Sequence, residues 1–117
     1  MATEKGIWIS YDFGLKGDYP GLFTWLDNHK AVECGNGLAF FKYENVDSSS
    51  DTKELINKIS SDLKDYVKLS KSDRLYIIWK DGLTRKVKGE FISGGRKQSP
   101  WEGYGKLKRD NFIDTDE

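Results

Sequence analysis

IWISYDF, residues 7–13, is the segment from which the fold prediction starts. It is rich in β-branched and aromatic residues, which favour a β-strand. Successive side chains of a strand point to opposite faces. One face therefore carries Ile7, Ile9, Tyr11 and Phe13, and the other carries Trp8, Ser10 and Asp12. The first face is apolar, which predicts that it packs on a hydrophobic core.

A helix is predicted directly after this strand. Asp18 is a good N-cap, and Pro20 falls in the first turn, where its missing N–H does no harm. The helix is expected to end near His29 or Lys30. Its apolar stripe, at helical spacing, is Tyr19, Leu22, Phe23 and Leu26.

A second helix follows the polar linker 44–50. Asp51 and Glu54 have the spacing of a capping box at its start. Apolar residues then recur at helical spacing, which predicts a buried face. These residues are Leu55, Ile56, Ile59, Leu63, Tyr66 and Val67.

Four further strand signals lie around the helices. Residues 31–34 and 38–43 flank Asn36-Gly37, a dipeptide suited to a type I′ hairpin turn. This turn predicts pairing of Cys34 with Ala39 and of Val32 with Phe41. Residues 74–80, RLYIIWK, are apolar on both faces, and an Asp81-Gly82 turn leads to a fifth strand at 84–93. Residues 94–117 contain Gly, aromatic and basic residues without a clear period, which predicts an irregular tail after a domain at 1–93.

The element order β, α, β, β, α, β is typical of the split βαβ, or ferredoxin-like, α+β fold. Right-handed crossovers place both helices on one face of a four-stranded antiparallel sheet, here with a fifth strand added. Trp8, Leu38 and Phe40 then lie on the face without helices. Because monomers rarely expose so large an apolar patch, this face predicts a homodimer.

Composition narrows the classes of protein to consider. The chain has 117 residues, the size of one domain, and 19 basic residues balance 19 acidic ones. Zero net charge excludes the overall positive field of a dedicated duplex-binding domain, so nucleic acid would be met by a local patch. Neither a spanning apolar run nor a secretory signal is visible, which favours a cytoplasmic protein without a membrane partner. One Cys and one His exclude an internal disulfide and a structural zinc cluster.

Asp12, at the end of the first strand, is the strongest single-residue candidate for a site. Two such carboxylates across a dimer axis could share Mg²⁺ or Mn²⁺ and orient a hydrolytic water against a phosphodiester. In the other interpretation, Asp12 is structural and caps the Gly14 loop. No cofactor is established by the sequence, and both interpretations stay open at this point.

A basic and aromatic cluster in the last third of the chain is the second candidate. Its residues are Arg85, Lys86, Lys88, Arg96, Lys97, Trp101 and Tyr104, continued by Lys106, Lys108 and Arg109. Cations interleaved with aromatic rings serve single-stranded nucleic acids. The simpler alternative is that the cations protect an edge strand and the rings anchor the tail to its own domain.

The Ser-Tyr-Asp end of the first strand, at residues 10–12, and the Asp-Tyr helix start at 18–19 accompany the split βαβ order and the extra strand. In these features residues 7–92 resemble the small CRISPR-associated adaptation-complex subunit and its SinR-like and virulence-associated protein D relatives. The resemblance implies a homodimer whose two sheets face each other. It also implies that the strand after the fourth pairs with the partner's sheet, and that Asp12 holds a divalent metal with its symmetry mate.

The sequence favours a non-catalytic homodimer of this nucleic-acid-linked family that binds a nucleic acid or a protein partner. One alternative is a weak metal-dependent nuclease that uses Asp12. The other is a ligand-sensing or protein-interaction dimer without a nucleic-acid role.

Overall fold

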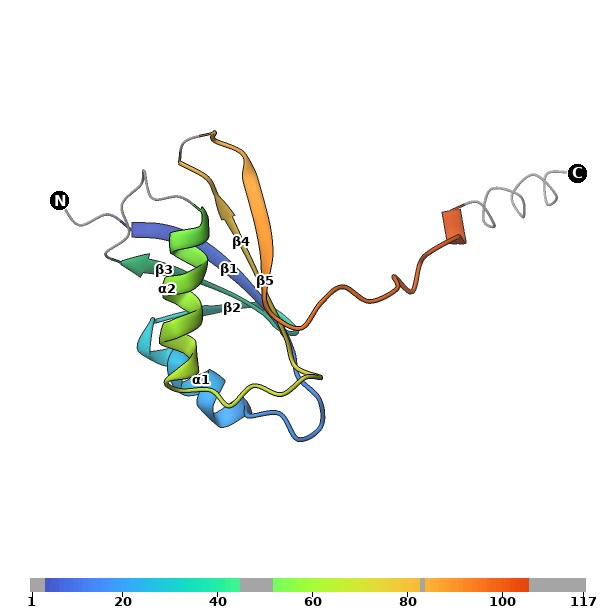
Figure 1. Cartoon of the computed structure of the whole chain (residues 1–117), viewed down its shortest axis with the longest axis horizontal. Coiled ribbons are helices and arrows are strands. Elements are labelled where there is room, and N and C mark those ends of the chain that lie inside the picture. Colours follow the sequence, from blue (N-terminus) through green and yellow to red (C-terminus); the bar gives the residue numbers. More distant parts are fainter. Residues whose placement is uncertain (1–3, 45–51, 83, 106–117) are drawn as a thin grey trace, which may run out of the picture.

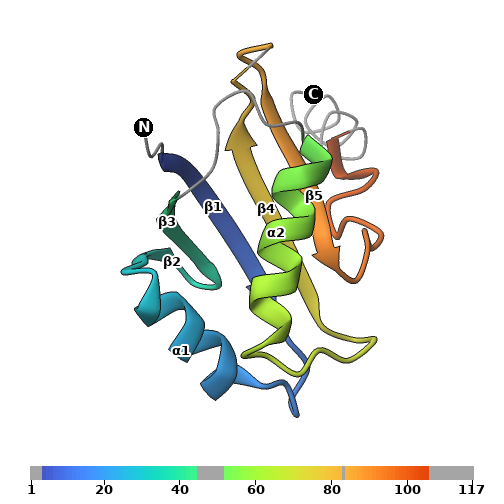
Figure 2. The same ribbon diagram turned by 60° about the vertical axis from the view of Figure 1, so that its left-hand side comes forward.

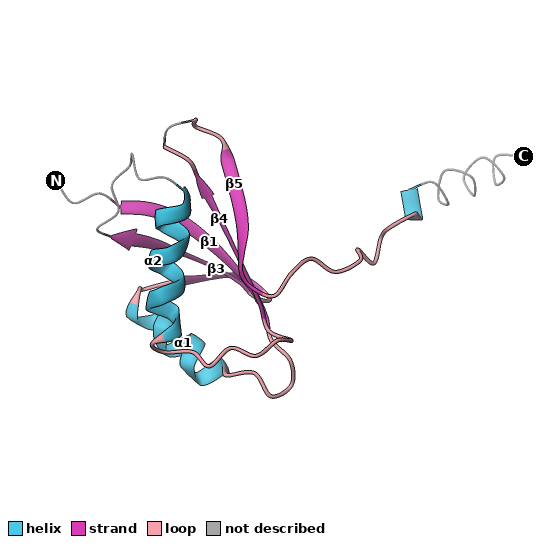
Figure 3. Cartoon of the chain, in the orientation of Figure 1, coloured by secondary structure: helices cyan, strands magenta, loops and turns pink. Residues whose placement is uncertain are grey.

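The chain forms an α+β fold in which two helices accompany a five-stranded antiparallel sheet (Figures 1 and 3). The structure, a computed structural model, describes residues 4–44, 52–82 and 84–105. The elements are β1 (Glu4–Asp12), α1 (Tyr19–Asn28), β2 (Val32–Gly35), β3 (Leu38–Glu44), α2 (Thr52–Lys64), β4 (Arg74–Lys80) and β5 (Val87–Ser93). None of the helices in these ranges is long and apolar enough to cross a membrane.

The strands lie in the order β2-β3-β1-β4-β5, so β1 and β3 are interior strands. β1 pairs antiparallel with both β3 and β4. β5 is a full member of the same sheet, because it pairs with β4 of its own chain from Lys80↔Val87 to Leu75↔Ser93. That pairing differs from the one implied by the family resemblance, in which the strand after the fourth joins the sheet of a partner.

Both helices lie on the same side of the sheet (Figure 2), and the hydrophobic core fills the space between. Ile7 and Ile9 are fully buried there, which confirms the face predicted from alternation in β1. The predicted stripe of α2 is confirmed at its centre, where Leu55, Ile59 and Leu63 are buried. Burying these side chains removes apolar surface from water, which is the main force that holds the layers together.

The core-facing side of α1 differs from the prediction by one residue. Leu22 and Leu26 are buried as expected, but Phe23 is exposed and Trp25 is fully buried in its place. The indole N–H of Trp25 donates to the Asp62 carboxylate of α2 at 3.0 Å. A buried Trp needs such a partner for its polar N–H, and the partner lies 37 positions away along the chain.

The N-cap of α1 is as predicted. The Asp18 carboxylate accepts hydrogen bonds from the Gly21 N–H at 3.0 Å and from the Lys68 N–H at 2.9 Å. These two bonds lower the pKa of Asp18 below its usual value, because they favour the ionised form. Asp18 thus joins the start of α1 to the segment that follows α2. The cap predicted for α2, Asp51, lies outside the described residues.

The register of β2 against β3 corrects the sequence prediction. Gly35 pairs with Leu38, so Asn36-Gly37 is indeed the two-residue turn. A bulge between Glu33 and Gly35 then shifts the ladder by one residue, and Val32 pairs with Phe40 rather than Phe41. A one-residue shift moves side chains to the other face of the sheet. In the observed register Val32 and Cys34 are exposed, and Val32 lies opposite Phe40 on the face without helices.

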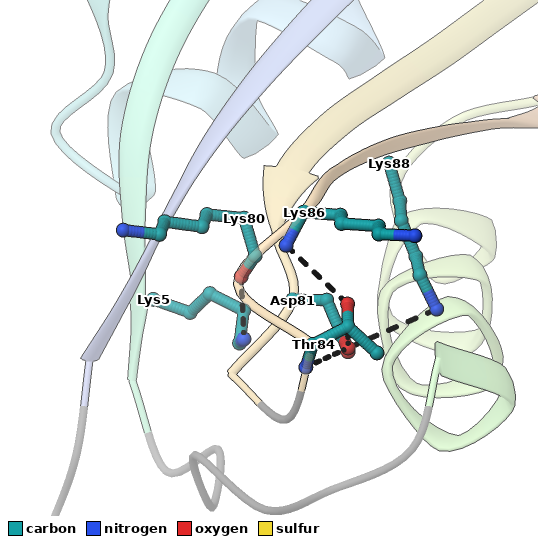
Figure 4. A network of polar contacts seen from close by, with 6 residues as sticks. All are labelled: Lys5, Lys80, Asp81, Thr84, Lys86 and Lys88. Carbon is teal, nitrogen blue, oxygen red and sulfur yellow. Dashed lines mark hydrogen bonds and ion pairs between the residues drawn. The ribbon is translucent and has the colours of Figure 1, made fainter.

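The hairpin between β4 and β5 has a longer loop than the predicted Asp81-Gly82 turn. The buried Asp81 carboxylate accepts from the Thr84 N–H at 2.9 Å and from the Thr84 hydroxyl at 2.8 Å, as Figure 4 shows. The Asp81 N–H donates to the Lys86 carbonyl at 2.8 Å, which closes the loop. Because these contacts keep residues 84–86 in the loop, β5 begins at Val87 and not at Thr84.

Candidate functional site

The sheet face without helices carries a row of aromatic side chains. Trp8 of β1 packs against Phe40 of β3 with ring centroids 4.8 Å apart, and Trp8 is 41% exposed. Tyr76 of β4 packs against Phe91 of β5 at 4.7 Å. Leu38, two residues before Phe40 in β3, shares this face because strand side chains alternate. The predicted set of Trp8, Leu38 and Phe40 therefore lies together on this face.

The tail leaves the end of β5 at Gly94 and extends away from the helices (Figure 1). Gly94 has φ +75°, a left-handed conformation that favours glycine. A Cβ at this position would also meet the Asp73 carbonyl oxygen at 2.7 Å. The turn at Gly94 thus depends on a residue without a side chain, and from this turn the tail runs away from the end of β5 (Figure 1).

A hollow of about 720 Å³ lies between this tail and the sheet face, and we call it the sheet–tail cleft. It is lined by Ser10 and Asp12 of β1, Arg74 and Tyr76 of β4, Phe91 of β5 and residues 96–101 of the tail. The walls therefore combine cations from Arg74, Arg96 and Lys97 with the rings of Tyr76, Phe91 and Trp101.

Asp12, the predicted metal ligand, faces a cation of its own chain inside the cleft. A terminal NH₂ group of Arg74 donates to Asp12 Oδ2 at 2.6 Å, and the two side chains are 57% (Asp12) and 28% (Arg74) exposed. This hydrogen bond lowers the pKa of the Asp12 carboxyl, and the positive charges of Arg74 and Lys97 act in the same direction. The pairing follows from the register, because Asp12 lies directly opposite Arg74 where β1 meets β4.

The alternative role proposed for Asp12, a cap on the Gly14 loop, is wrong. The carboxylate that accepts from the Gly14 N–H belongs to Asp73, at 3.3 Å. Asp73 is buried, and its other oxygen accepts from the Ser70 N–H at 2.9 Å. One carboxylate thus ties the loop after β1 to the loop before β4, and Asp12 is left facing the cleft.

Arg74 retains hydrogen-bonding capacity beyond its contact with Asp12. Its Nε is buried and has no hydrogen-bond partner within the part of the chain that is described. Across the same ranges, no group of three or more His, Cys, Asp or Glu side chains has the arrangement of a metal site. The side chains that line the cleft are mainly cationic and aromatic, together with the Asp12 carboxylate.

The predicted basic and aromatic cluster is divided between two places. Arg96, Lys97 and Trp101 line the sheet–tail cleft, whereas Tyr104 is exposed beyond it. Arg85, Lys86 and Lys88 lie at the opposite end of the β4–β5 hairpin, around the Asp81 loop, where Lys88 Nζ is 3.8 Å from Asp81 (Figure 4). Lys106, Lys108 and Arg109 lie outside the described residues.

Sequence reasoning missed Arg74, Tyr76 and Phe91 as members of the site. The available signal was the alternation in β4, since the even-numbered residues of RLYIIWK share the face of Trp8. Arg74 and Tyr76 could have been placed beside Asp12 once β1 and β4 were taken as neighbours. Phe91 required the register of β5, which the sequence did not determine because of the longer loop.

A second hollow, of about 650 Å³, lies on the helix side between the end of α1, α2 and β3. His29 Nε2 lies 3.2 Å from Asp62 Oδ2, the oxygen that also accepts from Trp25. His29, which lies where the sequence predicted the end of the first helix, thus contacts the Asp62 carboxylate of α2. Burial raises the pKa of the adjacent Tyr43 hydroxyl, and the charge of Asp62 adds to the rise.

Comparison of the chain with protein-family models, with curated proteins and with solved structures finds no match in any of the three. A fold alone does not define a function, which depends on the residues of the site.

Proposed function

We propose that this protein is a non-catalytic nucleic-acid-binding protein that takes up a short single-stranded segment in the sheet–tail cleft. The observation that carries the proposal is the meeting of Arg96, Lys97 and Trp101 with Tyr76 and Phe91 around one hollow. Cationic side chains neutralise phosphates, and aromatic faces stack on unpaired bases of any sequence. A duplex keeps its bases stacked inside and cannot use the rings in this way.

The state of Arg74 supports a phosphate ligand. Arg74 lines the cleft and its side chain is 28% exposed, so the accessible part of its guanidinium can contact a ligand there, whereas the buried Nε cannot. Phosphate oxygens are strong acceptors, and a guanidinium binds them in a fixed, directional geometry. A nucleotide phosphate near Arg74 would also lie close to Lys97, whose charge already reaches Asp12.

The same site argues against the nuclease alternative. A metal ion at Asp12 would have to displace or tolerate the Arg74 guanidinium, which already neutralises that carboxylate at 2.6 Å. Hydrolytic sites for Mg²⁺ or Mn²⁺ generally combine several oxygen ligands around the ion. Asp12 is accordingly proposed to limit the positive charge of the cleft and not to act in catalysis.

The resemblance of this fold to a known family is also part of the proposal. The order β2-β3-β1-β4, with both helices on one face, is compatible with a ferredoxin-like unit to which β5 is added at the edge. On this basis we keep the resemblance to the CRISPR-adaptation subunit as a hypothesis about ancestry. The cytoplasmic location expected from the sequence is part of the same hypothesis.

A homodimer through the helix-free face is the second candidate, and the exposure of Trp8 beside Phe40 favours it. A second copy on this face would cover the apolar row, and a protein partner of similar shape would do the same. Nucleic acid and a second copy would compete for part of the same surface. Trp8→Glu should therefore dissociate a dimer of this kind, because it places an unpaired charge at the centre of the interface.

The proposed function can be tested by fluorescence anisotropy with labelled 12-nucleotide RNA and DNA single strands and the matching duplexes. We expect saturable binding of the single strands and weaker binding of the duplexes. Arg96→Glu/Lys97→Glu should reduce the affinity about tenfold or more at low salt, since two phosphate contacts become repulsive. Lys53→Glu/Lys64→Glu on α2, which reverses the same number of charges on the helix side, is the matched control. Equal affinity of wild type and the double variant would refute the site.

A further inference from the structure

Strand β5 leaves one of its backbone edges open. It is the last strand in the sheet order, and its ladder is with β4 alone among the described elements. Val87, at the start of this edge, is 73% exposed. A bulge ends the regular ladder with β4 near the C-terminal end of β5, because Tyr76 pairs with Phe91 but Leu75 pairs with Ser93. The regular part of the open edge is therefore residues 87–91.

The sequence of this regular part, VKGEF, is complementary to itself. When two antiparallel copies are centred on Gly89, position 88 lies opposite position 90 and position 87 lies opposite position 91. Lys88 of each copy then meets Glu90 of the other, and Val87 meets Phe91. Opposite charges and apolar pairs directly across a ladder both stabilise it.

We propose that two copies of this chain associate through β5 by antiparallel pairing about a two-fold axis at Gly89. The pleat of the strand agrees with this register. Lys88 and Glu90 are paired with Trp79 and Ile77, whose side chains are buried on the helix side. Both charged pairs would thus lie on the helix side of the joined sheets.

Gly89 suits the position on the axis. A Cβ at residue 89 would collide with the Tyr76 hydroxyl, so the Tyr76 ring covers this residue from the helix-free side. An aromatic ring over a strand glycine compensates for the packing that glycine lacks. Lysines on an edge strand also discourage pairing with unrelated strands. A strand that pairs with this edge must therefore place a negative charge opposite Lys88 and a positive charge opposite Glu90. A second β5 meets this requirement.

The proposed dimer has a consequence for the sheet–tail cleft. Edge pairing about an axis perpendicular to the sheet keeps both helix-free faces on the same side, so the sheets become one continuous surface. The two clefts would open on that side, and neither Trp8 nor Phe40 would be covered. The inference does not depend on the proposed function, because it rests on the β5 edge alone.

Sedimentation velocity over a concentration series tests the proposal with charge variants. The wild type should form a reversible dimer. Glu90→Lys and Lys88→Glu should each weaken it about tenfold or more, because each variant faces two like-charged pairs across the axis. An equimolar mixture of the two variants should dimerise again, since both pairs of the mixed dimer then join opposite charges: the lysine introduced at position 90 meets the glutamate introduced at position 88, and the native Lys88 meets the native Glu90.

Controls separate this interface from loss of fold and from the face-to-face alternative. Glu33→Lys changes the charge equally on β2, at the opposite edge of the sheet, and should leave the dimer intact. Thermal melting shows whether Lys88→Glu remains folded, since Lys88 lies near Asp81. The proposal is overturned by a monomeric wild type, by folded variants that do not rescue each other, or by a dimer that dissociates with Trp8→Glu but persists with Glu90→Lys.

Discussion

Arg74 determines what Asp12 can do. A strand-end carboxylate on an open sheet face suggests a metal ligand, but the residue opposite it in the ladder is a cation. The pair is more than a third exposed on the Asp12 side, so solvent screens it and its contribution to stability is small. In the proposed function, this pair matters more for the ligand, because it neutralises Asp12 and leaves the positive charge of the cleft to Arg96 and Lys97.

Replacing Asp12 by Asn should therefore strengthen nucleic-acid binding. The substitution removes a negative charge beside Lys97 and frees the Arg74 guanidinium, so we expect a gain of about two- to fivefold, the worth of one exposed charge pair. Anisotropy with the labelled single strand measures it, and Asp27→Asn on α1 is the control. Weaker binding by Asp12→Asn would contradict this role. Metal-dependent cleavage by the wild type that this variant loses would restore the catalytic interpretation.

The buried Asp73 carboxylate holds the loop after β1 and the loop before β4 together. Its two oxygens accept from the Gly14 and Ser70 N–H groups. Asp73→Ala leaves both donors without this acceptor, and we expect a loss of about 2 kcal/mol in the free energy of unfolding. Chemical denaturation measures the loss, with Asp65→Ala on the surface as the control. A change as small as that of the control would show that these bonds are not formed in solution.

At the scale of elements, periodicity predicted most of the fold. Alternation in β1, the apolar run of β4 and the stripe of α2 were sufficient because burial of apolar faces dominates the energetics there. The errors arose where one residue changes the geometry. The bulge near Cys34 shifted β2, and the side chain of Asp81 extended the β4–β5 loop. Neither the bulge nor the Asp81 hydrogen bonds change the spacing of apolar residues, so hydrophobic periodicity does not reveal them.

Ile59 tests the packing of α2. It is fully buried against the sheet, so Ile59→Ala should lower the free energy of unfolding by about 2 to 5 kcal/mol through lost burial and a residual cavity. Urea denaturation is the measurement. Asn57→Ala, on the exposed side of the same helix, should stay within about half a kcal/mol of the wild type. Equal effects of both substitutions would contradict the orientation of α2.

The Asp81 loop should make the β4–β5 hairpin sensitive to acid. Hydrogen bonds from Thr84 lower the pKa of Asp81 below its ordinary value of 3.8. The ionised Asp81 therefore stabilises the fold fully above the pKa of the unfolded state. This stabilisation is lost as the pH falls through the lower pKa of the folded state. Asp81→Asn should lower the melting temperature at pH 7, and the difference from wild type should shrink below about pH 4. A difference that stays constant from pH 7 to pH 2.5 would contradict this role.

At the scale of the whole molecule, a neutral chain can still concentrate positive charge locally. Arg96 and Lys97 were visible in the sequence, but their meeting with Tyr76 and Phe91 depends on the turn at Gly94 and on the register of β5. Contacts between residues distant along the chain follow from the assembled sheet, which explains why the sequence suggested the types of residue in the site but not the cleft itself.

The most direct test of the central claim is a map of where a single strand binds. In a two-dimensional ¹⁵N–¹H NMR titration with an unlabelled 12-nucleotide single strand, we expect dose-dependent shifts of the Trp101 indole N–H and of four backbone amides, those of Ser10, Tyr76, Phe91 and Lys97. The indole N–H of Trp25, buried on the helix side, should not move. Shifts confined to α1 and α2, or none at ligand excess, would contradict the claim that the sheet–tail cleft binds nucleic acid.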